Sequence, residues 1–333
     1  MYRPSAATST ADEMETVAHL FEMKNRGSDI NYYVEAKATL TAISDLAVRH
    51  ALRSLEALST AFEAHGYLVV KANAAKHPGV ERGLEEYNTA VSKLASCEIG
   101  DINPTFIRTS LVCCRLFIAI EVRLGDFSLA VQHFVRGLHI MYQSCSRPSV
   151  DAEGRIVPGS KEDIPLLDLF IIKLFASANP VRWQMERPPS WQADMALAVP
   201  NYVPLRSNAR LELATLSTEV TSFLCYVTSL RHQHQIQGLL QWKAKLLETL
   251  QDWHDIHAEP IKDVMNGASP IRLRYAIAFA PFLYQILKIV TRLAMGNAVE
   301  ALNMLSDFED LGGIASYLTE LRKQVSDFRD QHK

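Results

Sequence analysis

The sequence has few cysteines, and none of them has a spacing that holds a metal. Five occur among the 333 residues, and no two are separated by two residues. Cys113 and Cys114 are adjacent within an apolar stretch, which is typical of buried structural thiols in a reducing compartment. A catalytic thiol needs a nearby base or cation, and the Arg115 side chain diverges from both on a helix. We therefore expect no catalytic cysteine.

The sequence also lacks clusters of positively charged residues. Lys and Arg number 34 against 37 Asp and Glu, so the formal net charge is −3, and no basic run occurs. Proteins that bind nucleic acid neutralise phosphates with clustered Lys and Arg. The basic residues Arg272, Arg274, Lys288 and Arg292 are spaced along one helix and predict a solvated face. The sequence therefore predicts no direct contact with nucleic acid.

Short catalytic and cofactor motifs are absent. The chain contains no GxSxG, P-loop, GxGxxG or HExxH pattern, so we expect no catalytic residue and no cofactor. His254 and His257 lie one helical turn apart and could bind a metal with Glu259, but Trp253 beside them favours a surface helix with a partly buried ring. His232 and His234 are expected to point to different faces. We therefore expect no metal.

No long hydrophobic run is evident. The longest candidate, at about 275–290, ends at Lys288 and is shorter than the ~20 apolar residues that cross a bilayer. No apolar segment follows a basic N-terminus, as a secretory signal would. We expect a soluble protein of the nucleus or cytoplasm, without a membrane partner.

The sequence is organised around residues 110–142. Apolar residues recur there at three- and four-residue intervals on both sides of Gly125 and Asp126. Gly125 suits the left-handed end of one helix, and Asp126 suits the cap of the next. The pattern predicts two antiparallel helices joined by a tight turn. Small residues Ala130 and Gly137 indicate close backbone approach by a neighbouring helix.

Helical periodicity continues through most of the chain, and almost no strand signal appears. We expect an all-α, multi-helix fold of antiparallel helix pairs: a loose tail at 1–12, then one helical domain over 13–333. Irregular excursions are expected near 146–164 and 179–206, where Pro and Gly are frequent. The expected helices are 13–27, 31–64, 81–96, the 110–142 pair, 164–177, 208–230, 232–256, 269–294, 297–309 and 311–331.

Several of these stretches resemble the regulatory region of fungal-specific transcription factors, the family that carries a zinc binuclear cluster. The resemblance covers about residues 40–180 and rests on the following groups: Arg49 to Leu52 with Leu55 to Leu58; Tyr87-Asn88, Ala90 and Leu94; Leu116-Phe117, Glu121, Gly125-Asp126, Ala130, His133 and Gly137-Leu138; and Leu167-Asp168. It implies that Glu121, Gly125, Asp126, Ala130 and Gly137 are structural signature positions. Glu121 is expected to find a partner in Arg115, Arg123 or the facing helix.

The zinc cluster itself is missing from the 333 residues. Six thiolates hold its two zinc ions, and five scattered cysteines cannot do so. The resemblance therefore implies a transcription-factor-like regulatory protein without its own DNA-binding domain. Such a protein would act through protein partners, for example another regulator, in the control of a metabolic gene set. A small-molecule effector remains open.

Two alternatives use the same helical core differently. One is an enzyme of small-molecule or secondary metabolism on a regulator-derived fold, suggested by the long loops that carry aromatic residues. The other is a helical scaffold that binds peptides. The Gly125-Asp126-Phe127 junction, with Ala130 and Phe134, resembles the second half of a tetratricopeptide repeat. The 34-residue period of that repeat is not sustained, so we expect hairpins that are only similar to it.

Overall fold

The computed structural model describes most of the chain. The described residues are 11, 13–18, 32–65, 77–96, 103–151, 153–160, 164–176, 207–296 and 304–331; the side chains of 63–65, 207–208, 272 and 326–331 lie outside the description. Within these ranges the protein is all-α, with one short two-stranded sheet. The excursion predicted at 179–206 lies outside the described residues, as does the tail at 1–12 except for residue 11.

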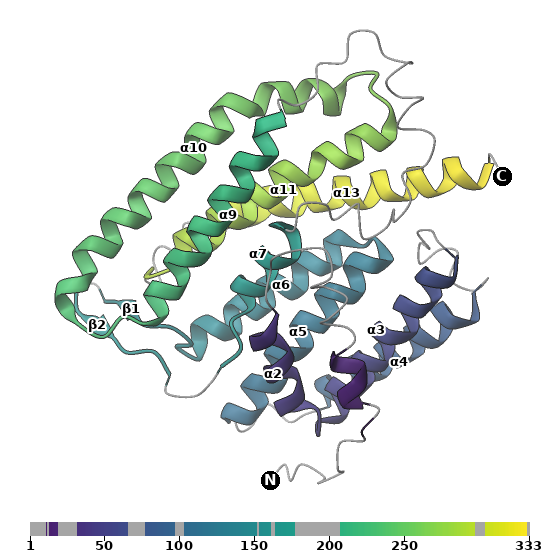
Figure 1. Cartoon of the computed structure of the whole chain (residues 1–333), viewed down its shortest axis with the longest axis horizontal. Helices are drawn as coiled ribbons and strands as arrows, with labels where there is room; N and C mark the ends of the chain where they lie inside the picture. The colour runs from purple at the N-terminus through teal and green to yellow at the C-terminus, as the bar shows by residue number, and fades with distance from the viewer. Residues whose placement is uncertain are drawn as a thin grey trace.

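The first half of the described chain is a series of helix pairs (Figure 1). Helix α3 packs on α4, and α5 packs on α6 and also on α3, so the two pairs form one stack. A short hairpin, β1–β2, follows α6 with Ser149 opposite Val157. The elements are α2 (Tyr33–Ala42), α3 (Leu46–His65), α4 (Pro78–Ala95), α5 (Pro104–Leu124), α6 (Phe127–Gln143), β1 (Ser149–Val150), β2 (Ile156–Val157) and α7 (Leu167–Ala176).

The second half forms a layer of longer helices beside this stack (Figure 1). Helices α9 and α10 pack together, α11 packs between α10 and α13, and α13 returns across α6. These elements are α9 (Ser207–Thr228), η3 (Gln233–Gln235), α10 (Ile236–Asn266), α11 (Ile271–Leu293) and α13 (Leu305–Gln331).

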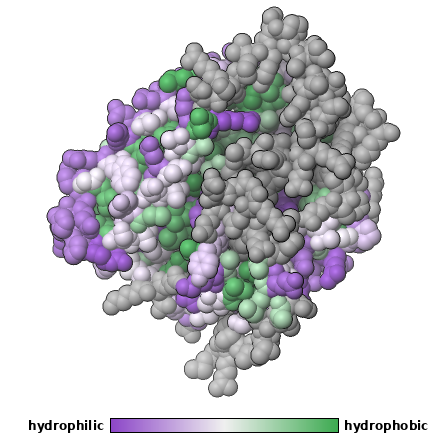
Figure 2. Space-filling view, in the orientation of Figure 1, coloured by the Kyte–Doolittle hydropathy of each residue, from purple (hydrophilic) through white to green (hydrophobic). Residues whose placement is uncertain are grey.

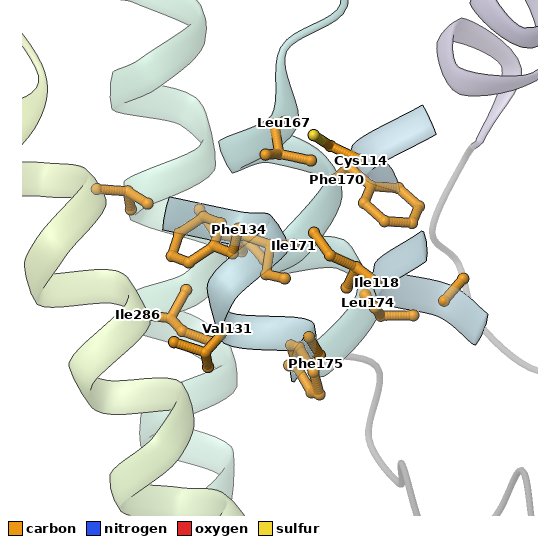
Figure 3. Packing of buried hydrophobic residues seen from close by; sticks show 14 of the residues in the cluster. Cys114, Ile118, Val131, Phe134, Leu167, Phe170, Ile171, Leu174, Phe175 and Ile286 are labelled. Atoms are coloured by element: carbon orange, nitrogen blue, oxygen red, sulfur yellow. The ribbon is translucent and has the colours of Figure 1, made fainter. Parts of the chain in front are cut away.

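The core lies where the two halves meet, around the short helix α7. Figure 3 shows apolar side chains of α5, α6, α7 and α11 converging there, including Ile118, Phe134, Leu167, Phe175 and Ile286. Each of these side chains is at least nine-tenths buried. Fully burying one such side chain contributes about 1.5–3 kcal/mol. Because α7 contacts α5, α6, α9 and α11, it joins the two halves.

Two predicted helix boundaries near the N-terminal half were wrong. The single helix expected over 31–64 is broken at 43–45, where the Asp45 side chain accepts the Ala47 N–H at 2.8 Å and starts α3. The first helix of the central pair begins at Pro104, not at residue 110. Asn103 caps it by accepting the Phe106 N–H at 2.8 Å, and proline suits the first turn because its missing N–H has no partner there.

Two further boundaries differ in the C-terminal half. Helix α10 continues to Asn266, past the predicted end at 256, with Pro260 on its exposed face. The break expected near residue 310 is also wrong, because α13 runs through Gly312 and Gly313. The helix is held there by tertiary packing of buried Leu311, Ala315 and Leu318, which can outweigh the weak helix propensity of glycine.

Helix α11 corrects the expectation about hydrophobic runs. Its residues 273–293 are long and apolar enough to cross a membrane by length and composition, although 67% of the most apolar part of this stretch is buried inside the protein. Helix α11 meets these two conditions even though it contains the charged residues Lys288 and Arg292.

Polar residues gather along the side of the molecule where α10 forms the edge (Figures 1 and 2).

Candidate functional site

The junction of α5 and α6 has the backbone that the sequence predicts. Gly125 adopts φ +78°, in the left-handed region, and its N–H donates to Val122 O at 3.2 Å. The Asp126 N–H donates to Glu121 O at 2.9 Å, and the Asp126 side chain accepts the Leu129 N–H at 3.0 Å. The last carbonyls of α5 and a first N–H of α6 are thereby satisfied.

Helix α13 covers this junction, which the sequence did not reveal. The Thr319 hydroxyl accepts the N–H groups of Phe127 (3.0 Å) and Ser128 (3.3 Å), so a side chain 192 and 191 residues away from them helps to cap α6. Arg322 is fully buried and packs against Gly125, the residue that ends α5. A cation is favoured at the C-terminal end of a helix. Burial lowers the pKa of Arg322, and the Tyr275 hydroxyl that faces it opposes this shift.

The two small residues of α6, Ala130 and Gly137, have different surroundings. Ala130 is buried in the core. A Cβ on Gly137 would overlap Leu167 Cδ2 and would lie 3.5 Å from Cys114 Cβ. The close approach is therefore made by a side chain of α7, not by a helix backbone as predicted.

Tyr87 of α4, Glu121 of α5 and His133 of α6 lie together between these helices. We call these three residues the buried polar cluster. The Tyr87 hydroxyl is 3.0 Å from His133 Nε2, and the Phe117 ring packs against both rings. Glu121 is fully buried. Burial raises the pKa of Tyr87 most, and the nearby Glu121 carboxylate raises it further. Helix α4 thus supplies a neighbour for Glu121 that lies outside the predicted options, which were Arg115, Arg123 and the second helix of the hairpin.

All three residues of the buried polar cluster belong to the stretches that carry the family resemblance, so the fold brings separate signature segments together. Arg115 was one of the predicted partners of Glu121, and its Nη2 donates to Leu166 O at 3.1 Å. The cluster is enclosed by helices, and its residues are at least nine-tenths buried. A buried, paired polar group rigidifies and specifies packing. The cluster thus ties α4 to the α5–α6 hairpin.

Replacing Tyr87 with phenylalanine should lower the free energy of unfolding by about 1–3 kcal/mol, because His133 and Glu121 would face a group that cannot form a hydrogen bond. Urea unfolding followed by circular dichroism measures the change. Tyr142→Phe is the matched control, because Tyr142 is exposed at the end of α6 and should tolerate the change. Equal stabilities for both variants would show that the Tyr87 hydroxyl is not needed.

The cysteine and histidine candidates lie in ordinary structural surroundings. Cys113 and Cys114 are both buried, and burial raises the pKa of Cys114 to about 12. His254 stacks on Tyr284, whereas His257 Nε2 lies 3.0 Å from Glu212 Oε2 on α9. The described residues include no group of three potential ligands that could hold a metal ion.

The expectation for His232 and His234 was wrong. Their rings stack with centroids 5.5 Å apart and planes only 10° apart. The reason is that both lie at the turn before α10, where η3 is a tight 3-10 helix and the α-helical spacing does not apply.

The predicted solvated face of basic residues on α11 was also wrong in part. Lys288 Nζ lies 2.9 Å from Asp307 Oδ1, and Arg292 forms an ion pair with the other carboxylate oxygen. Asp307 is almost fully buried, and its backbone carbonyl accepts the Gln285 amide at 3.0 Å. These cations join α11 to α13. The Arg272 side chain lies outside the described residues.

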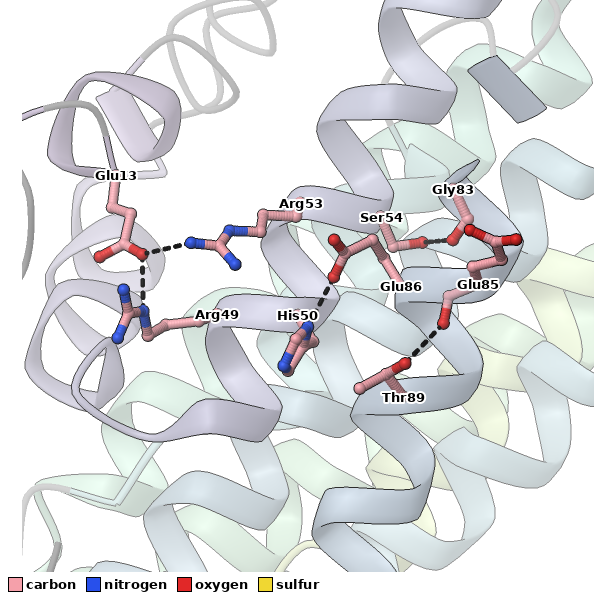
Figure 4. A network of polar contacts seen from close by, with 9 residues as sticks. All are labelled: Glu13, Arg49, His50, Arg53, Ser54, Gly83, Glu85, Glu86 and Thr89. Carbon is pink, nitrogen blue, oxygen red and sulfur yellow. Dashed lines mark hydrogen bonds and ion pairs between the residues drawn. The ribbon is translucent and has the colours of Figure 1, made fainter. Parts of the chain in front are cut away.

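A second set of polar contacts involves α3 (Figure 4). Glu13 Oε1 lies 2.6 Å from Arg49 Nε and 3.4 Å from Arg53 Nη2. His50 Nδ1 lies 2.6 Å from Glu86 Oε2 and ties α3 to α4. Glu13 belongs to a helical segment, residues 13–18, that the sequence placed at the start of the domain.

Comparison with known proteins gives a relative with a named role. No family model matches the chain, and no solved structure matches it. A curated protein, "Transcription regulator lscL" of Purpureocillium lilacinum, is 32% identical over 299 residues, which cover 83% of this chain and 66% of that protein. The chain thus spans about two thirds of the relative's length. Over most of its own length, the chain is similar to a transcription regulator, and this similarity supports a regulatory role.

Proposed function

We propose that these 333 residues act as a transcription regulatory domain that works through protein partners. The observation that carries the proposal is the 32% identity to a transcription regulator over 83% of the chain. The buried polar cluster is consistent with it, because the residues that resemble the fungal regulatory region hold its helices together.

The charge arrangement supports action through partners and not by direct DNA contact. A reader of DNA presents Lys and Arg outward to phosphates. Here several cations of the described chain are used within the fold instead. They are Arg49 and Arg53 with Glu13, Arg147 with Asp168, Lys173 with Glu35, and Lys288 and Arg292 with Asp307.

The regulatory role is tested by recruiting the chain to a promoter. The full chain, fused to an unrelated DNA-binding domain, should change expression of a reporter that carries the matching site. A Tyr142→Phe fusion is a matched control and should act like the wild type. A reporter that responds no differently from the DNA-binding domain alone, with the fusion present at normal level, would contradict the proposal.

Direct binding is tested separately by fluorescence anisotropy with labelled duplex DNA at low and moderate salt. We expect no sequence-selective binding below micromolar concentration by the purified chain. Electrostatic binding, if present, should weaken steeply with salt. Selective binding that persists at moderate salt would overturn the assignment to protein partners.

We also propose that the chain acts in the nucleus on a set of metabolic genes. The nuclear site follows from the role of the relative, whereas the gene set rests on the family resemblance. A fluorescent fusion observed in a fungal cell tests the first part. Transcript profiling after deletion tests the second, and unchanged metabolic transcripts would contradict it.

A further inference from the structure

We draw no further inference here: the strongest candidate, the surface patch where exposed Tyr226 of α9 packs against Trp242 of α10, is an apolar face, and nothing in the described part of the chain shows what covers it.

Discussion

Replacing Gly125 with valine is expected to lower the free energy of unfolding by roughly 3–5 kcal/mol. A β-branched residue is strained at φ +78°, and this backbone closes the α5–α6 junction. The new Cβ would also lie 2.6 Å from Arg322 Cγ, so a fully buried arginine and the helix that carries it would have to move. Urea unfolding followed by circular dichroism measures the loss.

Gly154→Val is the matched control for this prediction. Gly154 has nearly the same backbone angle, φ +75°, but nothing lies within 4 Å of a Cβ built there. It should therefore show the backbone strain without the displacement of Arg322, and its loss should be clearly smaller. Equal losses at the two positions would show that contact with α13 contributes nothing at the junction.

Alkaline unfolding is the second large effect that we expect. Burial is the main cause that raises the pKa values of Tyr32, Tyr87, Tyr275 and Tyr284 above the ordinary value, in the last case to about 12. In the unfolded chain these phenols ionise near pH ~10. The folded protein keeps its protons there, so the unfolded state binds fewer protons and stability falls as the pH rises.

The contribution of these tyrosines is thus fully present below about pH 10 and is lost above it. Each group costs about 1.4 kcal/mol per pH unit, so the four together cost roughly 5 kcal/mol by about pH 11. Tyrosinate absorbance and helical circular dichroism should change together in one transition. Tyr284→Phe should shift the midpoint to higher pH if the variant keeps its neutral stability, whereas the exposed Tyr226→Phe should not. Ionisation of these tyrosines before unfolding would contradict the prediction.

Several features followed from the sequence because their causes are local. Helical periodicity predicted the all-α fold, since one apolar face every 3.6 residues is written into each segment. Gly125 and Asp126 predicted the junction, because a left-handed residue and a capping side chain act within a few residues of themselves. The same reasoning failed at two places. At 43–45 a break in the predicted helix was missed, and near residue 310 a break was predicted where tertiary packing keeps α13 continuous.

The candidate site could be predicted only in part. The resemblance marked Glu121, Gly125, Asp126, Ala130 and Gly137, and the structure places all five within the packed α5–α6 hairpin. The packing of α4 on the hairpin is what brings Tyr87, Glu121 and His133 together in one cluster. No spacing in the sequence encodes it, because the three residues lie on separate helices.

By itself, then, the sequence determined the helices, the tight junction and the absence of a cysteine cluster, because composition and short-range spacing are properties of the chain alone. Only the tertiary structure decided that Leu167 covers Gly137 and that Arg322 and Thr319 of α13 pack on the junction. It also decided that Asp307 forms ion pairs with two cations of α11. Each of these contacts joins residues far apart in the chain. Their partners are set by which apolar faces pack together, and the charges are then paired where that packing buries them.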